Sequence, residues 1–135
     1  MVRETRQRNA IRNALGDAGR PLSVNEVYKM AQNKAAGLGI ATVYRNLKAL
    51  QLEGRIVQVD LPEQPRRWEV TPEEHHHHFL CRTCDKLFEI WGCPEDLTHL
   101  LPDGYTLEEH DLLLRGQCDA CAGKALSRFT PPKKR

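Results

Sequence analysis

The chain is short and nearly balanced in charge, with 135 residues and a net charge of +2 at pH 7. This length suffices for one ordinary domain or two small ones. No apolar run is long enough to cross a membrane, and the N-terminal residues MVRETRQRNA lack the apolar core of a secretion signal. We therefore expect a cytoplasmic protein without membrane contact, in which five cysteines suit metal binding better than disulfides.

The charge is divided unevenly along the chain. Residues 1–60 hold ten Lys/Arg and five Asp/Glu, a balance of +5, whereas residues 61–130 hold seven and thirteen, a balance of −6. The last five residues, PPKKR, add +3. A basic first half favours a polyanion as partner, and an acidic second half rich in Cys and His favours cations. Either half is also compatible with an ordinary solvated surface.

The first half predicts three helices. Residues 5–15 carry apolar side chains at helical spacing, and Gly16 can end this helix. Ser23 and Glu26 fit a capping box that starts a second helix. Thr42 is a candidate N-cap for a third helix that ends near residue 54.

The third helix is amphipathic. Val43, Leu47 and Leu50 share one face. The opposite face is small, polar and basic, and suits a major groove, where Arg contacts phosphate or guanine and Tyr contacts a base edge. Its candidate DNA-contacting residues are Thr42, Tyr44, Arg45 and Lys48. An ordinary solvated helix would show the same pattern, so the neighbouring elements must support the interpretation.

Strand patterns follow the third helix. Residues 56–59 and 67–70 read as two strands joined by a turn. Three helices followed by a hairpin is the order of a winged helix-turn-helix. After a linker at 71–74, we expect strands at 78–81, 86–90 and 105–114 and a short helix at 94–101.

Two Cys-x-x-Cys pairs form the strongest chemical signal. Each pair can place two thiolates on one tetrahedral ion, and two pairs complete a four-thiolate zinc site. The pairs are Cys81 with Cys84 and Cys118 with Cys121. A redox dithiol would not need the second pair, and chance pairing is the other alternative. We interpret the remaining Cys93 as a small buried residue and not as a ligand.

The histidine run before the first pair offers further ligands. In an extended segment the side chains alternate, so His76 and His78 face one side and His75 and His77 the other. One segment can therefore serve two metal sites, or it can be a solvated polyhistidine without purpose. Additional ligands for these sites are available at Glu69, Glu89, Asp96 or Glu95, and His110.

Taken together, these segments resemble the ferric uptake regulator family. The matching residues are TRQR at 5–8, LGIATVYRNLKALQLEGRI at 38–56, HHHHFLCRTC at 75–84 and CDAC at 118–121. The resemblance implies an α+β fold: an N-terminal winged helix-turn-helix followed by a small α/β dimerisation domain closed by a four-cysteine zinc site. It places the DNA-binding domain with the hinge at residues 1–72 and the dimerisation and metal-binding domain, with a basic tail, at 73–135.

The resemblance also assigns roles by position. Cys81, Cys84, Cys118 and Cys121 match a structural zinc site; Glu69, His76, His78 and Glu89 match a regulatory site at the hinge; His75, His77, Asp96 and His110 match a further site in the dimerisation domain. Tyr44 and Arg45 match residues of the recognition helix. The expected protein is a homodimeric, metal-dependent repressor that binds palindromic, A/T-rich operator DNA and controls metal homeostasis.

The chain departs from the family pattern at three places. The family often supplies another hinge histidine where this chain has Pro21, so the hinge set is short of a ligand or takes one from elsewhere, for example Asp60. Zinc-sensing members usually have a cysteine where this chain has Thr71. The stretch from Glu89 to His110 is also a few residues shorter than is common, so Glu95 is an alternative to Asp96 as the ligand there.

The hinge donors favour a hard cation. Two imidazoles and two carboxylates suit Fe(II) or Mn(II) better than a site with thiolate would, although Zn(II) still binds such a set. We therefore expect an iron or manganese sensor, with a zinc-uptake or a peroxide-sensing regulator as the alternatives. A metalloenzyme or a metal-storage protein is the alternative of a different class. No H-E-x-x-H motif supports an enzyme, and storage would not need a basic winged helix.

Overall fold

The computed structural model describes residues 3–94 and 96–125. They divide after Glu74 into two compact units, which are described separately. Glu95 and the basic tail lie outside the described residues. No described helix is long and apolar enough to cross a membrane.

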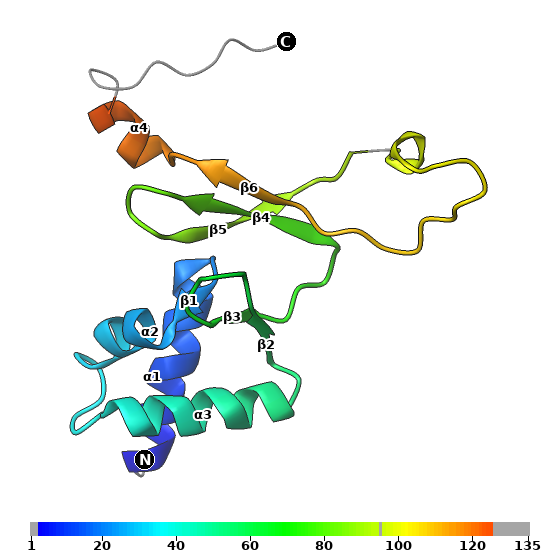
Figure 1. Ribbon diagram of the computed structural model, residues 1–135. Coiled ribbons are helices and arrows are strands. Elements are labelled where there is room, and N and C mark those ends of the chain that lie inside the picture. The colour runs from blue at the N-terminus through cyan, green and yellow to red at the C-terminus, as the bar shows by residue number, and fades with distance from the viewer. Residues whose placement is uncertain (1–2, 95, 126–135) are drawn as a thin grey trace. The chain divides into compact units, whose positions relative to one another are not determined.

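The first unit has the predicted winged-helix order (Figure 1). Its helices are α1 (Arg3–Ala18), α2 (Val24–Ala31) and α3 (Ile40–Leu52), and its strands are β1 (Leu22–Ser23), β2 (Ile56–Val59) and β3 (Arg67–Val70). The antiparallel sheet has the order β1-β3-β2. Sequence patterns predicted β2 and β3 with these bounds but missed β1, which is only two residues long.

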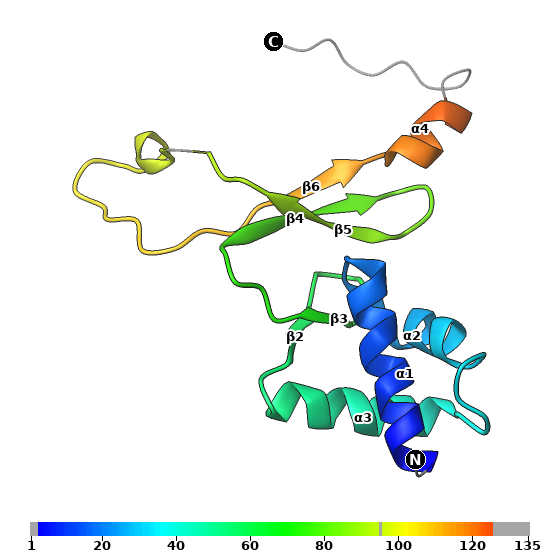
Figure 2. The ribbon, with the colours of Figure 1, turned by 180° about the vertical axis from the view of Figure 1, so that it is seen from behind.

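The three helices enclose one apolar core. Helix α1 crosses α3 and packs beside α2 (Figure 2). The core side chains are Ile11 and Leu15 from α1, Val27 and Ala31 from α2, Val43, Leu47 and Leu50 from α3, with Ile56 and Trp68 from the sheet. Burial of each large apolar side chain contributes about 1.5–3 kcal/mol, so this core fixes which face of α3 points outward.

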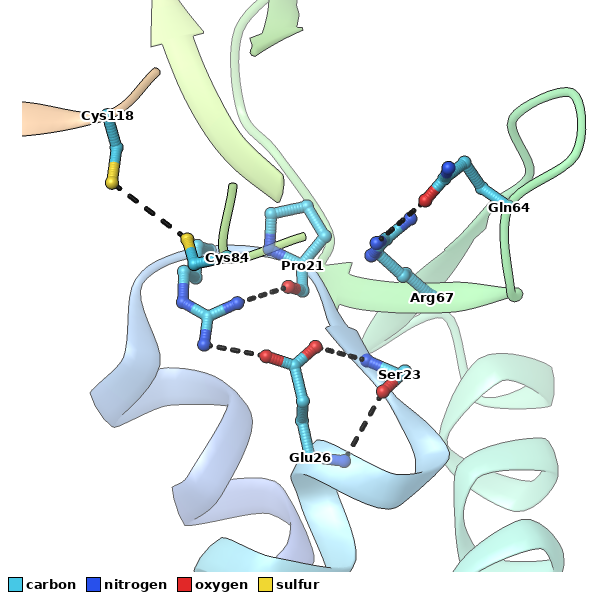
Figure 3. A network of polar contacts seen from close by, with 8 residues as sticks. Pro21, Ser23, Glu26, Gln64, Arg67, Cys84 and Cys118 are labelled. Carbon is cyan, nitrogen blue, oxygen red and sulfur yellow. Dashed lines mark hydrogen bonds and ion pairs between the residues drawn. The ribbon is translucent and has the colours of Figure 1, made fainter. Parts of the chain in front are cut away.

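The local signals were only partly correct at the helix ends. The capping box of α2 is present: the Glu26 backbone N–H donates to the Ser23 hydroxyl at 3.3 Å, and the Ser23 N–H donates to the Glu26 carboxylate at 3.1 Å (Figure 3). The proposed Thr42 cap is wrong, because α3 begins at Ile40 after Gly39 and has no side-chain cap. The first helix also continues past Gly16, since a single glycine is tolerated inside a helix.

The second unit is built on a three-stranded sheet of order β5-β4-β6. Its strands are β4 (His76–Cys81), β5 (Leu87–Trp91) and β6 (Leu113–Gly116), followed by α4 (Asp119–Ala125). Strand β4 pairs antiparallel with β5 and parallel with β6. A parallel neighbour requires a long return connection, and residues 92–112 provide it (Figure 1).

Within this connection two predictions were wrong. The expected helix at 94–101 is only a single 3-10 turn, η1 (Thr98–Leu100), in the described part of that segment. The expected strand at 105–114 begins only at Leu113, because the chain before it returns along the connection without a pairing partner in the sheet. Helix α4, which contains Cys121 of the second cysteine pair, was not predicted.

Candidate metal centres and nucleic-acid interface

Helix α3 presents a polar, cationic face to solvent. Val43, Leu47 and Leu50 are fully buried, whereas Tyr44 is half exposed and Arg45 and Lys48 are exposed. Lys48 follows Tyr44 by four positions and Arg45 by three, so it is a neighbour of both on the helix surface. The structure therefore leaves Tyr44, Arg45 and Lys48 accessible to a large ligand, and Thr42 half-buried at their edge.

The same side chains border a groove on the first unit. It is lined by Tyr44, Arg45, Lys48, Gln51, Leu52, Gln58, Arg66 and Trp68. The Tyr44 ring meets the Trp68 ring edge-on, with centroids 6.1 Å apart, and the Trp68 indole N–H donates to Gln51 at 3.1 Å. Three cations around an anchored aromatic pair make this surface complementary to a phosphate backbone. Sequence reasoning had missed Arg66, which lies in the turn before β3.

The four cysteines converge at one end of the second sheet. Cys81 ends β4, Cys84 follows in the turn, and Cys118 and Cys121 come after β6, whose Gly116 lies opposite Cys81 in register. All four sulfur atoms lie within 4.8 Å of one another. The Cys84 and Cys118 sulfurs are 3.9 Å apart (Figure 3). A tetrahedral zinc ion with Zn–S bonds of about 2.3 Å separates its sulfurs by about 3.8 Å, so the donor set fits zinc.

Backbone N–H groups stabilise the thiolate form of Cys81. Burial by itself raises the pKa of Cys81, but backbone N–H groups of Cys84, Cys118 and Thr83 pointing at its sulfur lower the pKa to about 6. The first two lie 3.5 and 3.4 Å from that sulfur. The hydrogen bond with Cys118 raises the pKa of Cys121 to about 12. The fold alone thus stabilises the thiolate of Cys81, whereas a divalent cation would have to stabilise that of Cys121.

Three histidines form a cluster in the second unit. His75, His77 and His110 gather with their rings in contact: the His75 and His77 centroids are 4.4 Å apart, and those of His77 and His110 are 5.1 Å apart. His77 is buried, and burial lowers its pKa, which favours the neutral imidazole that binds metals. The sequence prediction had placed all three in one site.

The fourth member of this cluster is Cys93, not Asp96. The sulfur of Cys93 lies 2.8 Å from the His110 Nε2 atom and 3.4 Å from the His77 Nε2 atom. The Asp96 carboxylate instead accepts hydrogen bonds from the backbone N–H and the hydroxyl of Thr98, which lower its pKa. Cys93 is exposed, so our interpretation of it as a buried residue is wrong. The sequence offered one indication of this arrangement: Cys93 lies between the histidine strand and His110 and had been given no role as a ligand.

The predicted hinge ligands lie on three strands. In the second unit His78 of β4 pairs opposite Glu89 of β5, and the rings of His76 and His78 are 4.8 Å apart on one face. His76 also stacks on Trp91, with ring centroids 4.9 Å apart. In the first unit Glu69 lies on β3, opposite Val57 of β2. The combination of all four ligands in one site stays a prediction.

The missing hinge histidine and its suggested substitute can both be examined in the first unit. Pro21 is fully buried before β1 and offers no ligand atom. Asp60, the suggested substitute, has its carboxylate bonded to the Gln58 amide and to Arg66 at 3.0 Å, and these contacts lower its pKa. Asp60 would have to leave both partners before it could bind a metal ion.

A comparison with protein families decides the relationship of this chain. The model described as "Ferric uptake regulator family" matches residues 1–115, most of the chain. The chain belongs to the ferric uptake regulator family. This is a family of metal-responsive regulators, and its winged helix, four-cysteine cluster and α+β fold are all present here.

Relatives in the ferric uptake regulator family include both iron and peroxide regulators. The ferric uptake regulation protein of Synechococcus elongatus is 29% identical over 111 residues, which cover 77% of this chain and 74% of the relative. The peroxide operon regulator of Bacillus subtilis is 26% identical over 126 residues, which cover 91% and 86%. These relatives are named as regulators and not as enzymes.

Solved structures of the family show the same fold. A zinc-bound manganese uptake regulator matches with a TM-score of 0.74 and 30% identity, over 83% of this chain and 87% of that one. The Helicobacter pylori ferric uptake regulator, described as having three functional metal-binding sites, matches with a TM-score of 0.64 and 28% identity, over 85% and 79%.

Proposed function

We propose that this member of the ferric uptake regulator family is a homodimeric repressor that binds palindromic, A/T-rich operator DNA only when a regulatory Fe(II) or Mn(II) ion is bound. Residues 1–72 would form the DNA-binding domain with the hinge, and residues 73–135 the dimerisation and metal-binding domain. The observation that carries the proposal is the presence in one chain of an exposed cationic α3 and of a strand, β4, whose residues contribute to two donor clusters within the second unit.

The four cysteines would hold a structural Zn(II) ion. Their sulfur separations fit tetrahedral thiolate coordination, and they tie the end of β4 to α4 across a long connection. Such sites contribute folding energy directly. We therefore assign this zinc to the stability of the second domain and not to sensing.

Glu69, His76, His78 and Glu89 would hold the regulatory ion. Two imidazoles and two carboxylates without a thiolate suit Fe(II) or Mn(II), while Zn(II) binds more tightly in absolute terms. The likeness to a manganese uptake regulator at 30% identity supports manganese as one of the two candidates. Availability in the cell and site geometry would then decide which ion acts.

Metal binding would be coupled to DNA binding because the four ligands come from different domains. Glu69 comes from the first domain and the other three from the second, so ligands sharing one ion restrict the orientation of the domains. Two recognition helices of a symmetric dimer bind tightly only when their separation matches the half-site spacing. By thermodynamic linkage, operator DNA must increase the affinity for metal by the same factor by which metal increases the affinity for DNA. The coupling free energy of typical allosteric pairs is about 1–3 kcal/mol.

The decisive experiment measures operator binding by the zinc-loaded protein with and without added metal. We expect fluorescence anisotropy to report tight binding with Mn(II), or with Fe(II) under anaerobic conditions, and weak binding with neither. Glu69→Ala and His76→Ala should abolish the metal response while keeping one zinc per chain and the dimer. The reverse outcome, full operator affinity without the added ion, would remove the regulatory role of the hinge. A response to Zn(II) alone would identify the zinc-uptake alternative.

A further inference from the structure

Cys93 closes a four-residue cluster in the second unit that is independent of the four-cysteine centre. The ligand atoms of His75, His77, Cys93 and His110 all lie within 4.8 Å of one another. They come from β4 and the residue just before it, and from the two ends of the 92–112 connection. The cluster is therefore assembled by the path of the connection and not by a local sequence motif.

The separations within the cluster match a tetrahedral metal site. With Zn–N bonds of about 2.0–2.1 Å and a Zn–S bond of about 2.3 Å, ligand nitrogens lie about 3.3 Å apart and a nitrogen and a sulfur about 3.5 Å apart. The His75 and His110 Nε2 atoms are 3.3 Å apart, and the His77 Nε2 and Cys93 sulfur atoms 3.4 Å apart. The 2.8 Å contact between Cys93 and His110 is shorter and corresponds to a direct hydrogen bond that coordination would replace.

The fourth donor determines which cation the cluster prefers. Carboxylate donors suit Mn(II), whereas thiolate is a soft ligand that selects zinc. With Asp96 held by Thr98 and Cys93 among the histidines, the set is three imidazoles and one thiol. We propose that these four residues form a His3Cys site that binds Zn(II) in preference to Mn(II), with Cys93 as a thiolate ligand. On binding, the S–H bond breaks, the sulfur donates to the cation, and the proton leaves to solvent.

Binding should also rearrange the chain at Leu112. The Leu112 backbone N–H donates to the Nδ1 atom of His77 at 3.1 Å, so the neutral ring carries its proton on Nε2. When His77 binds through Nε2, that proton must reside on Nδ1, and the hydrogen bond from Leu112 is lost. The Leu112 carbonyl accepts from the backbone N–H of His78, so the change occurs where β6 joins β4.

Cobalt(II) spectroscopy tests the proposal without reference to DNA binding. Full-length protein carrying one zinc per chain in the four-cysteine centre is titrated anaerobically with Co(II). A thiolate-to-cobalt charge-transfer band in the near ultraviolet, with zinc content unchanged, is expected because only Cys93 remains to supply a thiolate. The hinge set has no sulfur and gives no such band, so failure of this proposal is distinguishable from failure of the proposed function.

Two variants of one residue sharpen the test. Cys93→Ser should abolish the band and weaken zinc binding at this site by more than about 100-fold, since loss of mere outer-shell partners costs 10–100-fold. Cys93→Asp should abolish the band but narrow the preference for Zn(II) over Mn(II) by at least about tenfold, because it restores a hard donor. Cys93 is exposed, so both variants should fold, which circular dichroism and the retained zinc confirm.

Three results would overturn the inference. One is a wild-type protein without the charge-transfer band. Another is a band that persists in Cys93→Ser. The third is a site that Mn(II) fills as readily as Zn(II) in competition.

Discussion

The replacement of Arg45 by alanine should separate DNA binding from folding. The Arg45 guanidinium is exposed, and its hydrogen bond to the Thr42 hydroxyl, at 3.0 Å, joins two residues of the same helix. Exposed pairs three residues apart contribute about 0.2–0.5 kcal/mol, so the free energy of unfolding should change by no more than that. The buried face of α3 is untouched.

The expected loss of operator affinity is much larger. A bidentate contact from Arg to guanine contributes about 1–3 kcal/mol per site, and a dimer uses two copies of α3. The combined loss is about 2–6 kcal/mol, which corresponds to at least about a 30-fold weaker operator complex. A contact to phosphate would instead weaken all DNA sequences alike and reduce the slope of log K against log salt by about 0.9 per lost contact.

The assay is fluorescence anisotropy with operator and scrambled duplexes at several salt concentrations. Arg115→Ala is the matched control, because it removes the same charge from an exposed position on β6 of the second unit. It should leave operator affinity nearly unchanged. If Arg45→Ala binds operator within about twofold of the parent at moderate salt, the assignment of α3 to the DNA interface fails.

Three further predictions concern the metal centres and the first unit. Cys118→Ser should lose its zinc and the dimer, and the thermal midpoint should fall by many degrees; full zinc content with unchanged melting would refute a structural role. Glu69→Ala should keep that zinc but bind no more tightly to operator with Mn(II) than without it, as isothermal titration can check; an unchanged metal response would remove Glu69 from the hinge. Burial raises the pKa of Glu26, but the Arg20 and Ser23 hydrogen bonds outweigh it and hold the pKa below its usual value. Its contribution to stability is therefore present at neutral pH and is lost as the pH falls through that lowered pKa. Glu26→Gln keeps a capping side chain but should unfold about 1 kcal/mol more easily at pH 7, and the two denaturation curves should converge once the pH is below the lowered pKa of Glu26. An equal difference at neutral and at acidic pH would exclude the charge as the cause.

Sequence patterns predicted the structure correctly where the interacting residues lie close together along the chain. The Ser23–Glu26 capping box forms as predicted because its two partners lie within one helical turn. The outward face of α3 was predictable because a helix repeats every 3.6 residues, and three buried side chains determine where Arg45 points. The Thr42 cap failed because α3 begins two residues earlier, at Ile40 after Gly39, which places Thr42 inside the helix.

The sequence by itself determined the four-cysteine centre, since each Cys-x-x-Cys turn brings its own two sulfurs together and only the joining of two turns was left to the fold. Only the tertiary structure decided the fourth member of the histidine cluster. His77, Cys93 and His110 are separated by sixteen and seventeen positions, and their meeting depends on how residues 92–112 return to pair β6 with β4. No periodicity encodes such a path, so the sequence could not show that Cys93 lies among the histidines while Asp96, three residues further on, bonds to Thr98.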